Sequence, residues 1–110
     1  MSIKKISPKE LMDKLNEDER IFLVDVRAED KYNTYHIEDV NIEGINIPKT
    51  IIFNLSDEDS IEELPVGKEI IVTCSTGNSA TKCAAILSAK NFDVAVLEGG
   101  ITAWKEYAGK

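Results

Sequence analysis

Short apolar runs, separated by helical segments, constrain the fold of this chain more than any other feature. Residues 21–26 are apolar at every position except Asp25, and the segments 69–74 and 93–97 each begin with one acidic residue and are then apolar except for Thr73. Strands that are buried on both faces have this nearly continuous apolar character, because neither face of their sheet meets water. The alternation therefore predicts an α/β fold, in which helices cover both faces of a mostly parallel central sheet.

The first helix has a clear start signal. Ser7 is followed by Pro8 and Glu10, and this combination of N-cap, first-turn proline and capping-box glutamate predicts a helix that ends near Asn16. The other expected elements have weaker signals: helices over 28–35, 80–90 and 101–107, a short strand over 45–48, and a helical turn over 60–64. Residues 50–55 fit a strand or a loop equally well.

One cysteine stands where a strand gives way to a loop and then to a helix. Cys74 ends the run 69–74, small residues follow it, and the apolar spacing of helix 80–90 begins directly afterwards. This order places the thiol at the carboxyl edge of the sheet, facing loop N–H groups and the positive end of a helix dipole. Such a setting favours the thiolate, which is the nucleophilic form of cysteine. Cys74 is therefore the candidate nucleophile.

The second cysteine has a different expected role. Cys83 shares an apolar helical face with Ala80, Ala84 and Leu87, which predicts packing in the core. The alternative is a resolving thiol that forms a disulfide with Cys74. In a reducing compartment, both cysteines are expected to remain thiols.

Composition and charge narrow the class of partner. The 110 residues suit a single domain, and 20 acidic against 13 basic side chains give a net charge of −7. That balance argues against nucleic acid, which clustered cations bind. One His and two separated Cys match no usual zinc spacing, so no metal is expected.

No apolar run approaches the ~20 residues of a membrane span, and no signal-peptide core follows the N-terminus, so we expect a cytoplasmic location and no membrane partner.

Three segments carry motifs that can be compared with known families. The first comprises Leu23-Val24-Asp25-Val26-Arg27, Tyr32, His36-Ile37 and Gly44-Ile45-Asn46-Ile47-Pro48. The second is the six-residue loop Cys74-Ser75-Thr76-Gly77-Asn78-Ser79, and the third is Leu97-Glu98-Gly99-Gly100-Ile101-Thr102-Ala103-Trp104. In this order, the three segments resemble the signatures of the rhodanese family.

The resemblance implies a rhodanese-like three-layer α/β fold with a mostly parallel, five-stranded sheet. It also implies a sulfurtransferase that carries sulfane sulfur as a persulfide on Cys74. The sulfur would pass from a donor such as thiosulfate to a thiophilic acceptor, either cyanide or a thiol. No cofactor is implied, and the expected partners are a small sulfur-containing anion and a thiol acceptor, with a partner protein as a further candidate.

The same resemblance implies roles for residues around the cysteine. The loop that binds the substrate and the persulfide would comprise Ser75, Thr76, Gly77, Asn78 and Ser79. Asp25 and Arg27 would organise the nearby strand-to-helix turn, as an ion pair or a helix cap. Gly99 and Gly100 are expected to let the backbone turn close to this loop.

Two features depart from the family pattern. Many members have Arg or Lys directly after the cysteine or at the sixth loop position, where this chain has Ser75 and Ser79. The loop therefore lacks a side-chain cation for a dianionic donor. The second departure is an insertion over 38–43, which we expect to change a surface loop rather than the core.

The missing loop cations favour one alternative function. This is a catalytically weak rhodanese-like module that binds a partner protein or senses redox state. A phosphatase-like enzyme is excluded, because its longer loop needs an arginine where this chain has Ala80.

Overall fold

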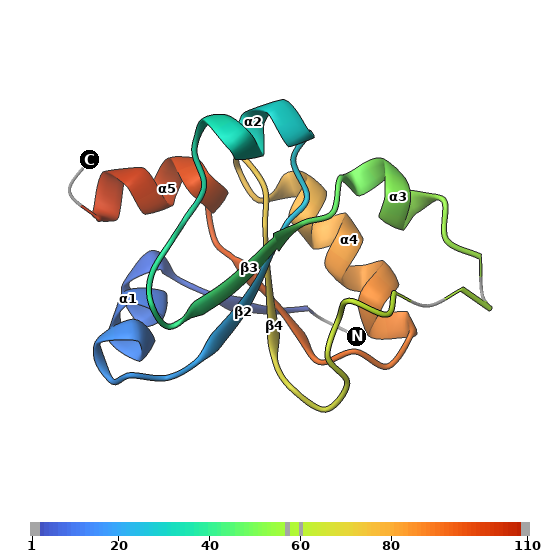
Figure 1. Cartoon of the computed structure of the whole chain (residues 1–110), viewed down its shortest axis with the longest axis horizontal. Coiled ribbons are helices and arrows are strands. Elements are labelled where there is room, and N and C mark those ends of the chain that lie inside the picture. Colours follow the sequence, from blue (N-terminus) through green and yellow to red (C-terminus); the bar gives the residue numbers. More distant parts are fainter. Residues whose placement is uncertain (1–2, 57, 60, 109–110) are drawn as a thin grey trace.

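The computed structural model describes residues 3–56, 58–59 and 61–108. Its strands are β1 (Lys4–Ile6), β2 (Ile21–Asp25), β3 (Ile42–Asn46), β4 (Ile70–Thr73) and β5 (Val94–Leu97). Its helices are α1 (Pro8–Asn16), α2 (Glu29–Thr34), α3 (Lys49–Phe53), α4 (Asn78–Ala89) and α5 (Gly100–Tyr107). Figure 1 shows these elements along the chain. In the described part, no helix has the length and apolar character needed to cross a membrane.

The five strands form one sheet in the order β1-β5-β4-β2-β3, and all four pairings are parallel. In this register Asp25, the last residue of β2, lies between Asn46 of β3 and Thr73 of β4. The carboxyl ends of three neighbouring strands therefore meet at one edge, where open parallel sheets place their ligand sites. The predicted α/β fold with a five-stranded sheet is confirmed.

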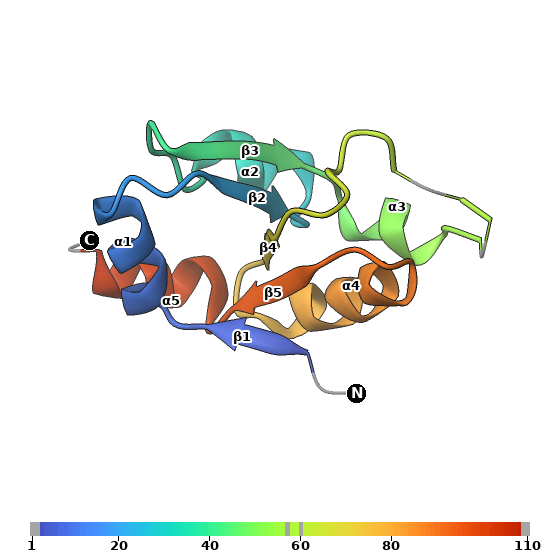
Figure 2. The same ribbon diagram turned by 90° about the horizontal axis from the view of Figure 1, so that it is seen from below.

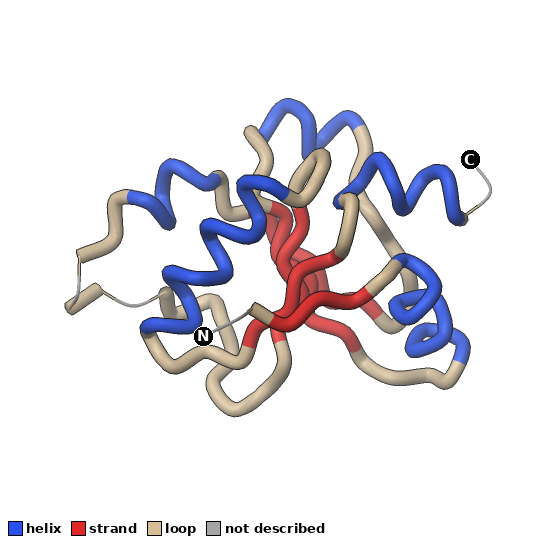
Figure 3. Tube along the Cα trace, turned by 180° about the vertical axis from the view of Figure 1, so that it is seen from behind, coloured by secondary structure: helices blue, strands red, loops and turns tan. Residues whose placement is uncertain are grey.

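Helices cover both faces of this sheet. Figures 2 and 3 show α1 and α5 on one side of the strands and α3 and α4 on the other. Consecutive strand residues point to opposite faces, so Val24 packs in the core beneath α3 and α4, and Leu23 packs in the core beneath α1 and α5. Helix α2 buries no residue and lies beyond the carboxyl ends of the strands (Figure 1).

The helix starts and ends agree well with the sequence signals. Ser7 caps α1 in a complete capping box with Glu10. The predicted helix 80–90 ends with α4 at Ala89, and Asn91, directly after its C-cap, has a left-handed conformation with φ +73°. Helix α4 begins at Asn78, two residues before the predicted start, because Gly77 provides a left-handed N-cap.

Three short segments differ from the predictions. Residues 50–55 are neither strand nor loop, since most of them belong to helix α3, which follows Pro48 and buries Ile52 in the core. Strand β1 was not predicted, because only Ile6 of its three residues is buried. Residues 61–64 form a turn closed by a 3.2 Å bond from the Leu64 N–H to the Ile61 carbonyl, rather than a helical turn, and residue 60 lies outside the described residues.

The insertion over 38–43 also contributes more than a surface loop. Strand β3 begins inside it, at Ile42, which pairs with Ile21 and packs against the core. The expectation of a purely superficial change is therefore wrong. The physical reason is that β2 is buried from its first residue, Ile21, and each residue of β2 pairs with a residue of β3. Strand β3 therefore has to begin within the insertion, at Ile42.

Candidate active site

The sulfur of Cys74 lies in a cradle of backbone N–H groups. Cys74 follows β4 directly, and its Sγ accepts hydrogen bonds from the N–H groups of Gly77, at 3.0 Å, and Ala80, at 3.3 Å. Both donors belong to the first turn of α4 or its cap, where N–H groups have no partner within the helix. Such bonds are stronger when the acceptor is charged, so the cradle stabilises a thiolate more than a thiol.

Gly77 allows the loop to turn its N–H groups toward the sulfur. Its φ of +102° lies in the left-handed region, which side chains with a Cβ adopt at a cost. A Cβ at this position would meet its nearest atom, the Gly99 nitrogen, at an ordinary 3.5 Å. Glycine is therefore required here by backbone conformation rather than by lack of space.

The first turn of α5 holds the loop from behind. The N–H of Ile101 donates to the Cys74 carbonyl at 2.8 Å, and the N–H of Thr102 donates to the Ser75 carbonyl at 3.0 Å. A Cβ on Gly100 would lie only 2.3 Å from the Cys74 carbonyl oxygen. The predicted close approach at Gly99 and Gly100 is confirmed, and it directs the loop carbonyls toward α5 and away from the sulfur.

A buried ion pair fixes the turn after β2. Arg27 Nη2 lies 2.7 Å from Asp25 Oδ2, and the two side chains are only 9% and 2% exposed. Arg27 Nη2 also donates to the Tyr35 carbonyl at 2.6 Å, and Asn46 Nδ2 donates to the carbonyls of Asp25 and Arg27, both at 2.9 Å. Burial of two charges is tolerated when the remaining polar atoms are satisfied in this way. The expected ion pair is therefore present, and its bonds tie β2, β3 and the end of α2 together.

A cleft of about 320 Å³ opens over the cysteine. Its lining comes from the end of β2, from α2, α3 and the loop, and comprises Val26, Arg27, Ala28, Lys31, Lys49, Cys74, Ser75, Thr76 and Ser79. Three of the predicted loop residues thus share the cleft with the sulfur, while Gly77 contributes its N–H. Asn78 does not join them, since it is exposed and lines a separate hollow with Glu98 and Lys5.

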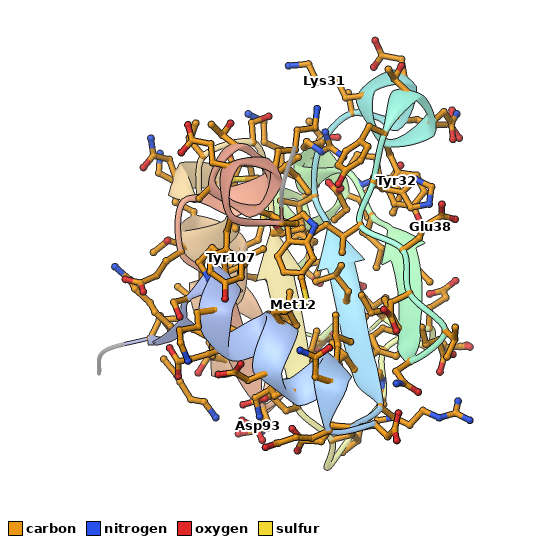
Figure 4. All side chains as sticks on the ribbon, turned by 90° about the vertical axis from the view of Figure 1, so that its left-hand side faces the viewer. Met12, Lys31, Tyr32, Glu38, Asp93 and Tyr107 are labelled. Atoms are coloured by element: carbon orange, nitrogen blue, oxygen red, sulfur yellow. The ribbon has the colours of Figure 1, made fainter. Side chains whose placement is uncertain are left out.

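Sequence reasoning missed the basic side chains of the cleft. Lys31 of α2 and Lys49 of α3 line it together with Arg27, although the loop itself carries no cation. Figure 4 shows Lys31 at the end of the molecule where the strands finish. Lys31 follows β2 and Lys49 follows β3, and residues that follow neighbouring parallel strands gather at one edge of the sheet. That rule was the available signal, and the two lysines bring to the cleft the positive charge that the loop lacks.

Cys83 lies in the core, as predicted. Its side chain is fully buried in the cluster beneath α4. Burial, and to a lesser extent the negative charge of Cys74, raises the pKa of the Cys83 thiol to about 11. Cys83 is therefore a neutral thiol at ordinary pH. The described residues include no group of three or more His, Cys, Asp or Glu that could hold a metal ion.

Comparison with known proteins identifies the family. A family model described as "Rhodanese-like domain" matches residues 7–107. The chain belongs to this family. It is 29% identical over 106 residues to "Putative sulfurtransferase YtwF" of Bacillus subtilis, a match that covers 96% of this chain and 93% of that protein. It is 33% identical over 84 residues to "Thiosulfate sulfurtransferase GlpE" of Pseudomonas syringae, covering 76% and 71% of the two chains.

Some relatives contain the rhodanese-like domain within a longer chain. The match to "Probable adenylyltransferase/sulfurtransferase MoeZ" of Mycobacterium tuberculosis is 33% identical and covers 90% of this chain but only 24% of that protein. Among solved structures, a rhodanese-like domain protein from Staphylococcus aureus is similar with a TM-score of 0.76 and 28% identity, covering 93% and 91% of the two chains. These similarities support a sulfurtransferase-type role for the rhodanese-like domain.

Proposed function

We propose that this protein is a sulfurtransferase that carries sulfane sulfur as a persulfide on Cys74. The observation that carries the proposal is the position of Cys74 Sγ, which accepts two backbone N–H bonds and lines an open cleft. A nucleophile needs both features, because the anion must be stabilised and the substrate must reach it. The chain would act as one domain over residues 1–110.

In the loading step, the Cys74 thiolate attacks the outer sulfur of a donor such as thiosulfate. A new S–S bond forms on Cys74 Sγ, the S–S bond of thiosulfate breaks, and sulfite leaves with the electron pair. A monoanion and a dianion thus give a persulfide monoanion and a dianionic product, so the charges balance. The N–H groups of Gly77 and Ala80 stabilise the thiolate before the step.

In the delivery step, cyanide or the thiolate of an acceptor attacks the outer sulfur of the persulfide. The S–S bond to Cys74 breaks, and the cysteine leaves as a thiolate, which the N–H groups of the cradle again stabilise. Both steps move one neutral sulfur atom, so neither consumes an external electron. This is two-step nucleophilic catalysis on one cysteine.

The neighbouring residues have supporting roles in this proposal. Ser75, Thr76 and Ser79 line the cleft and offer hydroxyl groups to the substrate. Asp25 and Arg27 are positioning residues, since their ion pair fixes the turn that forms one wall of the cleft. The acceptor is a small thiophile or the thiol of a partner protein, which the open cleft can admit.

The alternative is a catalytically weak module that binds a partner or senses redox state. This alternative was favoured by the lack of cations in the loop, and the basic residues around the cleft weaken that argument. Incubation with thiosulfate, removal of excess donor and measurement of the intact mass distinguish the two. A gain of one sulfur atom supports the enzyme, and no gain from thiosulfate supports the weak module.

Two matched variants test the role of each cysteine. We expect Cys74→Ser to abolish cyanide-dependent thiocyanate production, and Cys83→Ser to change it by less than about twofold, because only Cys74 meets the N–H cradle. The rates of the wild-type protein and both variants are compared under identical conditions. An equal loss in Cys83→Ser would contradict a single-cysteine mechanism.

A further inference from the structure

A second hollow, of about 280 Å³, lies beside the cleft and is largely apolar. Its lining comes from β3, α3 and the turn after α3, and comprises Ile45, Asn46, Ile47, Ile51, Ile61 and Glu63. Ile51 is 52% exposed, and Phe53, on the same short helix, is 42% exposed. Exposed apolar side chains that gather around a hollow are typical of a surface that binds a partner.

The hollow and the cleft share parts of their walls. Lys49 of α3 lines the cleft, and Ile51, two residues later, lines the hollow. Asn46 lines the hollow, and its Nδ2 donates at 2.9 Å to the carbonyl of Arg27, which lines the cleft. A molecule can therefore occupy both spaces only if it extends past the start of α3. Cyanide is too small to do so, whereas a polypeptide is long enough.

The hollow also lies at an open edge of the sheet. Strand β3 is last in the strand order, and within the described residues it pairs with β2 alone. Figure 2 shows it as the outermost strand on its side of the sheet, opposite β1. Edge strands leave N–H and C=O groups unpaired, so an extended chain can pair with them and point alternate side chains to one face. A chain paired with β3 would place such a side chain beside Ile45, in the hollow.

The charges around the two spaces are opposite in sign. Glu63 is the one charged side chain among the described residues that line the hollow, whereas Arg27, Lys31 and Lys49 line the cleft. A complementary partner therefore carries a basic residue next to the apolar side chain that enters the hollow. The reactive thiol of that partner lies further along its chain, over the cleft.

We propose that the hollow beside β3 binds an extended segment of an acceptor protein, which places an apolar side chain in the hollow and its thiol in the cleft over Cys74. This inference rests on the proposed sulfurtransferase function. In the transfer, the acceptor thiolate bonds to the outer sulfur of the persulfide, the S–S bond to Cys74 breaks, and Cys74 keeps the electron pair as a thiolate. The acceptor leaves as a persulfide, and no oxidant or reductant is consumed.

Synthetic acceptor peptides test this docking site. Each peptide carries one cysteine and, at a spacing that varies along the series, a lysine followed by a leucine; its matched peptide has serine in place of the leucine. The protein is loaded from thiosulfate and mixed with each peptide, and the loss of sulfur from its intact mass gives a second-order rate constant. At the spacing that fits, we expect the leucine peptide to react about tenfold faster than the serine peptide, because the leucine side chain leaves water.

Variants of the hollow locate the effect. Ile51→Ser removes part of the apolar wall and Ile51→Trp fills the space, so each should reduce the ratio of the leucine rate to the serine rate to less than about twofold. This ratio does not depend on how much of a variant is folded. Val66→Ser is the matched control, because Val66 is 83% exposed in the turn before β4, at the opposite end of that strand from Cys74. It should keep the wild-type ratio.

Two results would overturn this inference alone. One is a wild-type protein that delivers sulfur to cyanide but reacts equally with the leucine and serine peptides at every spacing. The other is a leucine preference that survives in Ile51→Trp. A wild-type protein that gains no sulfur from thiosulfate would overturn the proposed function, and this inference with it.

Discussion

The two cysteines occupy the same strand–loop–helix unit and have opposite environments. Cys74 stands before the first turn of α4, where N–H groups lack helical partners and two of them donate to its sulfur. Cys83 stands in the middle of the same helix, where the N–H groups are used within the helix and burial raises its thiol pKa to about 11. The comparison shows that the surroundings, rather than the residue type, separate a candidate nucleophile from a core residue: Cys74 has backbone N–H donors, and Cys83 has only a desolvating core.

Apart from the loss of Cys74 itself, the largest effect on activity should come from the glycine that forms the cradle. Gly77→Val forces a β-branched residue toward φ +102°, so the loop would abandon the conformation that points its N–H groups at Cys74. We expect sulfur loading from thiosulfate to fall about a hundredfold, in line with the loss of an anion-stabilising donor. Initial rates of thiocyanate production measure the change.

Gly67→Val provides the control for backbone strain. Gly67 also has a positive φ, of +80°, and a Cβ there meets no atom within 4 Å, but it lies before β4, at the opposite end of that strand from the loop. Both substitutions should destabilise the fold by about 1–2 kcal/mol. If Gly67→Val lost as much activity as Gly77→Val, the cradle would not be the cause.

A smaller effect should appear at the other cysteine, in the stability of the protein at high pH. The unfolded chain ionises Cys83 near its ordinary pKa of 9.0, whereas the folded protein delays ionisation to about 11. The unfolded state therefore loses its proton first, and the free energy of unfolding falls as pH rises through this window, by about 2–3 kcal/mol at its upper end.

Urea unfolding of the wild-type protein and Cys83→Ala at a series of pH values measures this linkage. Cys83→Ala is less stable at every pH because of the cavity it leaves, so the slopes are compared rather than the absolute values. The variant should show a shallower fall between pH 9 and 11. Identical slopes would mean that burial does not raise the pKa of Cys83 in the folded protein.

The sequence predicted the fold best where a local physical requirement, such as burial or helix capping, determines the structure. The apolar character of residues 21–26 and the capping box at Ser7 led to the correct sheet and first helix, because burial and N–H capping are local requirements. The position of Cys74 at the start of the loop followed from the strand–loop–helix order.

The errors occurred where distant contacts decide the outcome. The β-branched residues of Lys49–Phe53 fit a strand locally, yet this segment forms α3 because Ile52 packs into the core next to α4. Strand β1 has only the pairing with β5 to define it. Lys31 and Lys49 reach the cleft only because neighbouring strands end together, which a motif confined to the loop cannot show.

The most direct test of the account locates the transferred sulfur on one cysteine. Trypsin cleaves after Lys68, Lys82 and Lys90, so Cys74 and Cys83 fall on separate peptides, over 69–82 and 83–90. The protein is loaded with thiosulfate without reductant, blocked with iodoacetamide and digested, and both peptides are weighed. We predict one additional sulfur atom on peptide 69–82 and none on peptide 83–90. Additional sulfur on peptide 83–90, or equal amounts on both, would contradict the assignment of the persulfide to Cys74.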